Sequence, residues 1–219
     1  MIRLHHCPQT RSMRSLWLLH ELGIEFAVKT YGFGPEIKAE TYLDLNPTGR
    51  VPSLEIDGDV LFESGAIAEV LCERHPDAGF GRGAGDPERA AWLNWVHYAE
   101  TVSQHVAALT QQHVMLFEDW MRSPTVMKLE AARLRKCYGA IDDALGGQAY
   151  LLPCGFSAAD IGVGQAVYMG AHFAALDGFE HLQDWMARLQ ARPAFQASLP
   201  DDANRLYQQD FYPAWEQPK

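Results

Sequence analysis

Patterns typical of β-strands occur only in the first third of the chain, and this asymmetry constrains the fold most. Residues 2–6 alternate as a strand does, and the alternation returns over residues 24–28. Between them, apolar residues recur at helical spacing over residues 13–20, and Gly23 follows as a typical C-terminal cap. A strand, a helix and a second strand joined by a short crossover predict a parallel pair with a right-handed connection.

A β-hairpin is predicted in the next segment, after a weaker helical stretch. Residues 52–56 and 59–62 flank Asp57-Gly58, and an Asp-Gly dipeptide between two alternating apolar runs is a strong hairpin signal. A further helix is predicted to start at Ser64, whose side chain suits the N-cap position. The resulting order of strands and helices is that of a thioredoxin-like α/β domain.

The rest of the chain is predicted to be helical. Residues 79–86 are rich in glycine and indicate a linker. Beyond the linker, apolar residues keep helical spacing, and we find no strand pattern or internal repeat. Ser157 and Asp160 form an acidic variant of the capping box at the start of one predicted helix. We therefore predict an α+β protein of two domains, thioredoxin-like over residues 1–78 and an all-helical bundle over residues 87–219.

Composition excludes several classes of partner. The chain carries 18 Lys and Arg against 28 Asp and Glu, a formal net charge of −10. This charge repels phosphate backbones and anionic lipid surfaces, so we expect neither nucleic acid nor a membrane as a partner. Apolar runs fall far short of the ~20 residues that span a bilayer, and no signal-peptide core is present. The four cysteines are widely spaced, which is typical of reduced thiols in a cytoplasmic protein.

Four short motifs are specific in combination and in order. They are PQTRSMR, NPTGRVP, FESGAI and FSAAD, at residues 8–14, 46–52, 62–67 and 156–160. Together they resemble the cytosolic glutathione S-transferase family, and the likeness covers essentially the whole chain. The start of the chain is most similar to bacterial and fungal members in which the loop after the first strand carries a serine, and Thr10 occupies the matching position here. The resemblance implies glutathione as co-substrate and a two-fold homodimer.

The resemblance also implies a glutathione site. The family holds the bond before Pro52 in the cis form, and the backbone of Val51 then pairs with the cysteinyl unit of the peptide. The helix that begins at Ser64 offers N–H donors and a partial positive charge to the γ-glutamyl carboxylate. Glu63 is a candidate partner for the γ-glutamyl ammonium group, and Arg50 for the glycyl carboxylate. The alternative is that Pro52 only bends the chain and Ser64 only caps the helix.

The reactive thiol then belongs to the ligand. A free thiol has a pKa of about 8.5, and lowering this pKa by two units requires about 2.7 kcal/mol of preferential thiolate stabilisation. A hydroxyl at the start of the first helix can donate to the sulfur, and the helix N-terminus adds its partial charge. Thr10 is the first candidate for this catalytic donor and Ser12 the second. The alternative is that Thr10 only caps the helix.

The remaining cysteines and histidines give no strong motif. His97, His105 and His113 recur every eight residues, too far apart to share a metal ion on one helix, so we expect no metal. Cys7 lies beside the predicted site and lacks a resolving cysteine. We interpret it as a small buried filler, with mixed-disulfide formation as the alternative.

The favoured function is conjugation of the glutathione thiolate to small hydrophobic electrophiles, as in detoxification. The electrophile pocket is expected between the domains, walled by the loop after the first strand and by Tyr98, Val102 and His105. One alternative is a glutathione-dependent disulfide or peroxide reductase, in which the same thiolate attacks sulfur or oxygen. Another is a non-catalytic transferase-like binding module.

Overall fold

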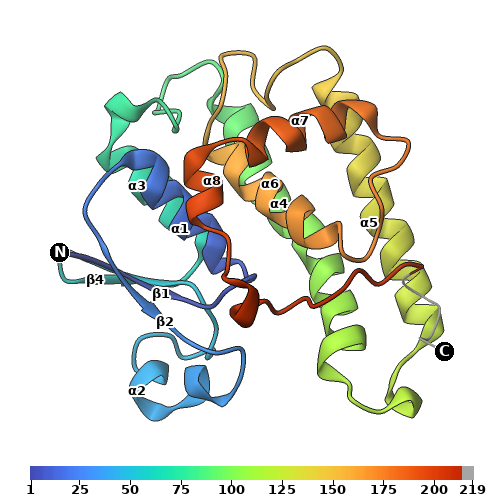
Figure 1. The fold of residues 1–219 in the computed structure, drawn as a ribbon. Coiled ribbons are helices and arrows are strands. Elements are labelled where there is room, and N and C mark those ends of the chain that lie inside the picture. The colour runs from blue at the N-terminus through green and yellow to red at the C-terminus, as the bar shows by residue number, and fades with distance from the viewer. Residues whose placement is uncertain (214–219) are drawn as a thin grey trace.

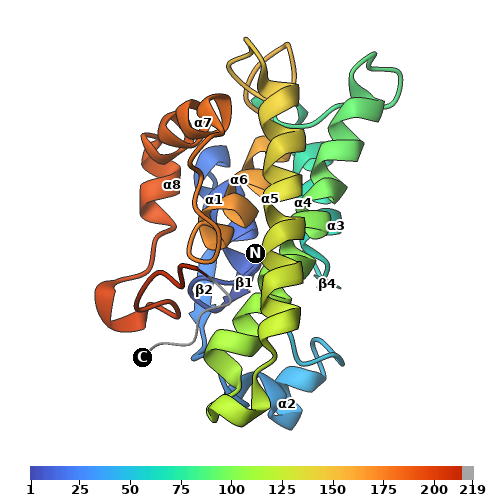
Figure 2. The same cartoon turned by 90° about the vertical axis from the view of Figure 1, so that its right-hand side faces the viewer.

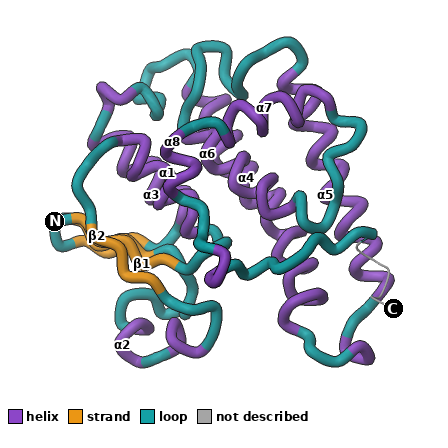
Figure 3. The backbone as a smooth tube through the Cα atoms, in the orientation of Figure 1, coloured by secondary structure: helices purple, strands orange, loops and turns teal. Residues whose placement is uncertain are grey.

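Four strands form one mixed sheet in the order β2-β1-β3-β4 (Figure 3). The central strand β1 (Ile2–His6) pairs in parallel with β2 (Ala27–Thr30) and antiparallel with β3 (Ser53–Ile56). The fourth strand, β4 (Asp59–Leu61), pairs antiparallel with β3 across the Asp57-Gly58 turn. This computed structural model describes residues 1–213, so the last six residues of the predicted helical domain lie outside it. The predicted parallel pair and hairpin are confirmed, although β2 begins three residues later than the alternation over residues 24–28 predicted.

Helices cover both faces of the sheet. The helices α1 (Ser12–Leu22) and α3 (Ser64–Arg74) lie on one face, and the short α2 (Glu40–Leu43) lies on the other (Figure 1). The weaker helical stretch that the sequence predicted before the hairpin is observed as a 3₁₀ turn at Pro35–Lys38 followed by α2. The first helix ends at Gly23, whose φ of 62° lies in the left-handed region that glycine adopts at low cost.

After α3, the described residues are helical or irregular. The longer helices are α4 (Arg89–Thr110), α5 (Pro124–Leu145), α6 (Ala158–Gly170) and α7 (Glu180–Gln190), followed by the short α8 (Pro193–Ala197). The predicted class, a thioredoxin-like α/β part followed by a helical part, is confirmed. The boundaries at residues 78 and 87 stay a prediction. No helix within residues 1–213 has both the length and the hydropathy needed to cross a bilayer.

One predicted cap is displaced by a residue. Glu63, with extended backbone, is the N-cap of α3, and Ser64 is the first helical residue. Ser64 therefore does not cap the helix with its side chain, and its hydroxyl is available for another partner. The predicted capping box at α6 is confirmed: Ser157 Oγ accepts from the backbone, and Asp160 accepts from Ser157 N at 2.9 Å.

The first helix joins the two halves. Its broad apolar face packs on the sheet and also on α6 and α8, as Figures 1 and 2 show. Trp17 is fully buried, and its ring meets that of Phe195 in α8 edge to face at 4.9 Å between centroids. A helix that is apolar around most of its circumference is buried on most sides. This position places the start of α1, and the first loop before it (residues 7–11), at the meeting point of the two halves.

Candidate functional site

The segment before β3 is held firmly by its backbone. The carbonyl of Arg50 accepts hydrogen bonds from Tyr42 Oη at 2.6 Å and from Asn46 Nδ2 at 2.7 Å. The Val51–Pro52 bond is cis, as the resemblance implied. Val51 is partly exposed, and within residues 1–213 neither its N–H nor its C=O has a hydrogen-bond partner. An extended peptide can therefore pair with this residue in the manner of an added strand.

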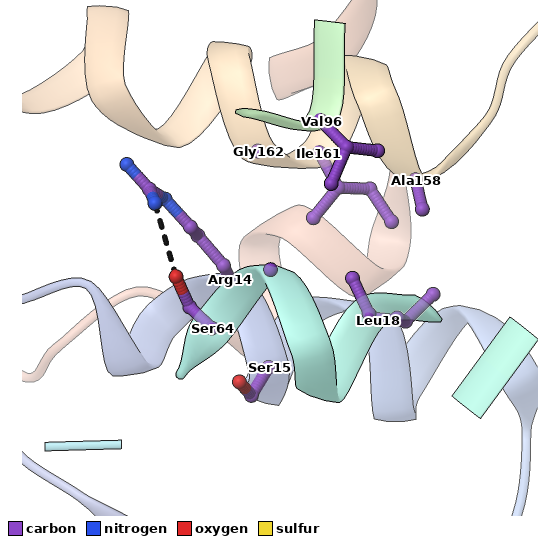
Figure 4. Close-up of a pocket in the computed structure, with 10 residues that line it drawn as sticks. Arg14, Ser15, Leu18, Ser64, Val96, Ala158, Ile161 and Gly162 are labelled. Carbon is purple, nitrogen blue, oxygen red and sulfur yellow. Dashed lines mark hydrogen bonds between the residues drawn. The ribbon is translucent and has the colours of Figure 1, made fainter. Parts of the chain in front are cut away.

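The N-terminus of α3 lies open to an anion. The first-turn N–H groups of a helix have no intrahelical partner, and the exposed N-cap residue here, Glu63, makes no side-chain capping bond to them. Ser64 is buried, and its Oγ accepts from Arg14 Nη1 at 3.1 Å (Figure 4). Helix N-terminal N–H groups, a hydroxyl and a guanidinium together make a site suited to a carboxylate.

Arg14 is the centre of a buried hydrogen-bond network. It lies on α1, is 6% exposed, and donates to Gln165 Oε1 of α6 at 2.8 Å. On α4 it donates to the Ala99 carbonyl at 3.1 Å, to Ser103 Oγ at 2.5 Å and to Glu100 Oε1 at 2.5 Å. The guanidinium therefore ties the start of α3 to both central helices of the other half. No sequence pattern singled out this residue.

Glu100 completes the charge balance of this network. Its carboxylate also accepts from Arg11 Nε, at 2.9 and 3.0 Å. Burial raises the pKa of the Glu100 carboxyl, but Arg14 and Arg11 outweigh this effect and hold the pKa below its usual value. Glu100 is therefore ionised at neutral pH and compensates the buried positive charge.

The two hydroxyls of the predicted thiol donor site differ in access. Thr10 is partly exposed on the first loop, and its Oγ1 donates to the Cys7 carbonyl at 2.7 Å. Ser12 is fully buried, and its Oγ accepts from Cys7 N at 3.0 Å and lies 2.8 Å from Thr10 Oγ1. Of the two side chains, Thr10 is therefore the more accessible. Ser12 instead holds the first loop in place through its hydrogen bond with Cys7 N.

His6 of β1 forms the buried end of this hydrogen-bond network. Its Nδ1 lies 2.8 Å from Ser12 Oγ, and the side chain is 5% exposed. Burial lowers the pKa of His6 to about 4, against a hydrogen bond with Ser12 that raises it. The imidazole is therefore neutral at physiological pH, and His6, Ser12 and Thr10 form an uncharged row of hydrogen-bonding groups.

We expect the buried neutral histidine to make stability depend on pH. The unfolded chain binds a proton at His6 near pH 6.5, whereas the folded chain does so only near pH 4. The free energy of unfolding should therefore fall by about 3 kcal/mol from this group as the pH drops from 6.5 to 4. Urea unfolding of the wild type and His6→Asn at several pH values measures the difference in slope. Parallel curves for the two proteins would contradict the assignment.

Cys7 has no character of a reactive thiol. Its side chain is 1% exposed, and burial, with a smaller effect from Glu36, raises the pKa of the thiol to about 11. A thiol of this kind is protonated at neutral pH and a poor nucleophile. This supports the interpretation of Cys7 as a buried filler.

The residues predicted to wall the electrophile pocket do not face the first loop. Val102 is fully buried in the core, and His105 Nδ1 pairs with Glu130 Oε2 of α5 at 2.6 Å. Tyr98 is half-buried, and burial together with its neighbour Cys137 raises its pKa. At 3.6 residues per turn, Tyr98 and His105 lie roughly 150° around α4 from Glu100, which contacts the first loop. The expected helical phase is therefore corrected: these side chains face α5 and the core.

Arg50 directly precedes Val51, and Glu63 is the N-cap of α3; their roles toward glutathione stay predictions. Both are exposed. Among residues 1–213, no group of three or more histidine, cysteine, aspartate or glutamate side chains is placed to hold a metal ion.

Comparisons with known proteins identify one family. Residues 6–74 match the family model for the glutathione S-transferase N-terminal domain. The chain is 30% identical over 196 residues to a probable glutathione S-transferase, GSTF1, from Oryza sativa subsp. japonica, covering 84% of this chain and 89% of that protein. It is 25% identical over 205 residues to glutathione S-transferase 3 from Schizosaccharomyces pombe, covering 89% and 85%.

A solved structure shows the same fold. The glutathione transferase homolog from Lodderomyces elongisporus, with two GSH per subunit, superposes with a TM-score of 0.82 over 90% of this chain and 96% of that chain, at 21% identity. The sequence match and the fold lead to one conclusion. The chain belongs to the glutathione S-transferase family.

Proposed function

We propose that this protein binds glutathione and transfers its thiolate to small hydrophobic electrophiles, a reaction of detoxification. The observation that carries the proposal is the convergence of three groups near the start of α1. They are the unpaired backbone of Val51, the open N-terminus of α3 beside Arg14, and the partly exposed hydroxyl of Thr10. A tripeptide with a carboxylate at one end and a thiol in the middle matches this set.

Each part of glutathione has a partner in this proposal. The γ-glutamyl carboxylate binds the first N–H groups of α3 and Ser64, with Arg14 behind them, and Glu63 accepts from the ammonium group. The cysteinyl backbone pairs with Val51, whose position is set by Pro52 and by the bonds to the preceding carbonyl. The exposed Arg50 takes the glycyl carboxylate.

Thr10 stabilises the thiolate in this proposal. Its hydroxyl donates to a backbone carbonyl in the structure, and rotation about the Cβ–Oγ1 bond redirects that hydrogen to a sulfur placed above the loop. Donation to an anion is stronger than donation to a neutral carbonyl, so the bound thiolate is favoured. The start of α1 adds its partial positive charge.

Reduction of disulfides by the same thiolate is the second candidate function. In that reaction the sulfur of glutathione attacks a disulfide, and the leaving thiolate takes a proton from solvent. The raised pKa of Cys7 favours glutathione itself, rather than a protein thiol, as the nucleophile in either reaction. Parallel assays with an aromatic halide and with a mixed disulfide decide which reaction dominates. Activity with neither, and no glutathione binding by calorimetry, would indicate a non-catalytic module.

We expect Ser64→Ala to weaken glutathione binding by about 1–3 kcal/mol, roughly 5–150-fold in Kd, the usual result of losing a hydrogen bond to a charged group. Ser15→Ala is the matched control, because Ser15 and Ser64 both line a small cavity between α1, α3, α4 and α6 (Figure 4), and the buried Ser15 Oγ has no partner among the described residues. Isothermal titration calorimetry measures both. Equal dissociation constants for Ser64→Ala and the wild type would remove Ser64 from the site.

We also propose a homodimer and a cytoplasmic location. Large apolar side chains are exposed at and just after the β4 edge, with Val60 40% and Phe62 41% exposed, which favours contact with a second subunit. The cysteines support the proposed cytoplasmic location. All four, Cys7, Cys72, Cys137 and Cys154, are free thiols, as expected for a reducing compartment.

A further inference from the structure

A second cavity lies behind the first loop. Its volume is about 280 Å³. Side chains from the first loop, α6, α8 and the following segment line it, among them Gln9, Tyr168, His172, Phe195, Arg205 and Tyr207. In Figure 2, α8 and the segment after it lie on the opposite side of α1 from α3, and no residue proposed to bind glutathione lines this cavity.

Aromatic rings make up much of the cavity wall. The ring of Tyr168 meets that of Phe195 edge to face, with centroids 5.6 Å apart. The ring of His172 lies 4.9 Å from that of Tyr207 and 6.1 Å from that of Tyr168. Phe195 and Tyr207 are only 1% and 2% exposed, so the partly exposed Tyr168 and His172 offer most of the ring surface against which a flat apolar ring packs favourably.

Two of the polar side chains that line the cavity, Tyr168 and Arg205, have donors free for a ligand. The Tyr168 oxygen accepts from Gln9 Nε2 at 3.1 Å, and its own hydrogen has no acceptor within residues 1–213. Burial raises the pKa of Tyr168, so the hydroxyl stays protonated and able to donate. Arg205 is half exposed, with one nitrogen 2.9 Å from Asp202 Oδ1, which leaves further guanidinium donors for a ligand. A hydroxyl and a guanidinium donor together favour a carboxylate.

We propose that this cavity binds a small aromatic carboxylate, with the ring against Tyr168 and His172 and the carboxylate on Arg205. The volume suits one ring and its acid group, because cavities for drug-sized ligands run to about 300–1,000 Å³. The cavity shares no residue with the proposed glutathione site, and it adjoins the first loop at Gln9.

Gln9 connects the cavity to the first loop. Its side chain is 2% exposed and fixed at both ends, through Nε2 to Tyr168 Oη and through Oε1 to Tyr207 N at 3.0 Å. Its φ of 48° is uncommon for a residue other than glycine, so these two bonds help hold a costly backbone conformation. Gln9 directly precedes Thr10. An occupant that fixes the two tyrosines therefore also restrains the loop.

Calorimetry with benzoate tests the site, and benzamide is the neutral probe of the same shape. We expect benzoate to bind at least about tenfold more tightly than benzamide, because only benzoate forms a charged pair with Arg205. Arg205→Gln should remove this preference. Arg133→Gln is the matched control, since Arg133 is similarly exposed and also pairs with an acid three residues before it.

One further variant and one further readout locate the bound benzoate. Ser64→Ala should leave benzoate affinity unchanged, whereas a loss there would show that benzoate occupies the α3 N-terminus, which overturns the proposal. Equal affinity for the two probes, no saturable binding, or no effect of Arg205→Gln would also overturn it. Hydrogen exchange of the peptide at residues 8–13 should slow at least about threefold with benzoate bound. Protection confined to residues 199–207 would refute the link through Gln9.

Discussion

Arg14→Ala is expected to lower the free energy of unfolding by about 3–5 kcal/mol, the range seen when one partner of a buried charged network is removed. The substitution takes the donors from Gln165 Oε1, Ser103 Oγ and the Ala99 carbonyl. Each buried polar group left without a partner costs about 1–3 kcal/mol. Urea unfolding followed by tryptophan fluorescence measures the loss.

Arg11→Ala provides the matched control. Arg11 pairs with the same carboxylate, Glu100, but at the surface, where such pairs contribute about 1 kcal/mol or less. Arg14→Lys keeps the positive charge and loses the planar, forked set of guanidinium donors. We therefore expect its free energy of unfolding to lie between those of the wild type and Arg14→Ala. If Arg14→Ala were no more destabilising than Arg11→Ala, the network would not join the two halves of the molecule.

Thr10→Val is expected to lower turnover by about 10²–10³-fold, the usual effect of removing one donor to a reacting anion. Valine nearly preserves the shape of threonine and deletes only the hydroxyl. Glutathione affinity should change far less than turnover, because the γ-glutamyl and backbone contacts lie elsewhere. Thr10→Ser should keep most of the activity. Steady-state kinetics with glutathione and an aromatic halide give both constants.

Ser12 tests the choice of donor. Ser12 is buried and accepts from Cys7 N, so Ser12→Ala should destabilise the loop and act on activity only through that loss. A folded Ser12→Ala protein with an upward shift in the pH–rate profile, together with an active Thr10→Val protein, would make Ser12 the donor. If neither substitution affects the rate, the helix N-terminus alone activates the thiol.

Much of the fold follows from local patterns. Alternation in β1 and β3, the Asp57-Gly58 turn and the Gly23 cap each act over a few residues, so a single sequence reveals them. The site motifs around Val51 and Ser64 were also visible, because their residue types suit a turn and a helix start. Their roles toward glutathione stay predictions.

The network around Arg14 was not visible in the sequence. Its partners Ser64 and Gln165 are 50 and 151 residues away along the chain, and nothing local pairs them with an arginine on an apolar helix. The orientation of α4 was also missed. Most of that helix is apolar on more than one face, so periodicity alone does not tell which face meets α1 and which meets α5.

Titration of the thiolate ultraviolet absorbance in the bound complex tests most directly whether this site holds the glutathione thiol as a thiolate. Free glutathione should titrate with a pKa of about 8.5, with only a few per cent thiolate at pH 7. Bound to the wild type, the thiol should titrate about two units lower, and in Thr10→Val the value should return most of the way toward that of the free thiol. A bound thiol that titrates at its free value in the wild type would contradict the account.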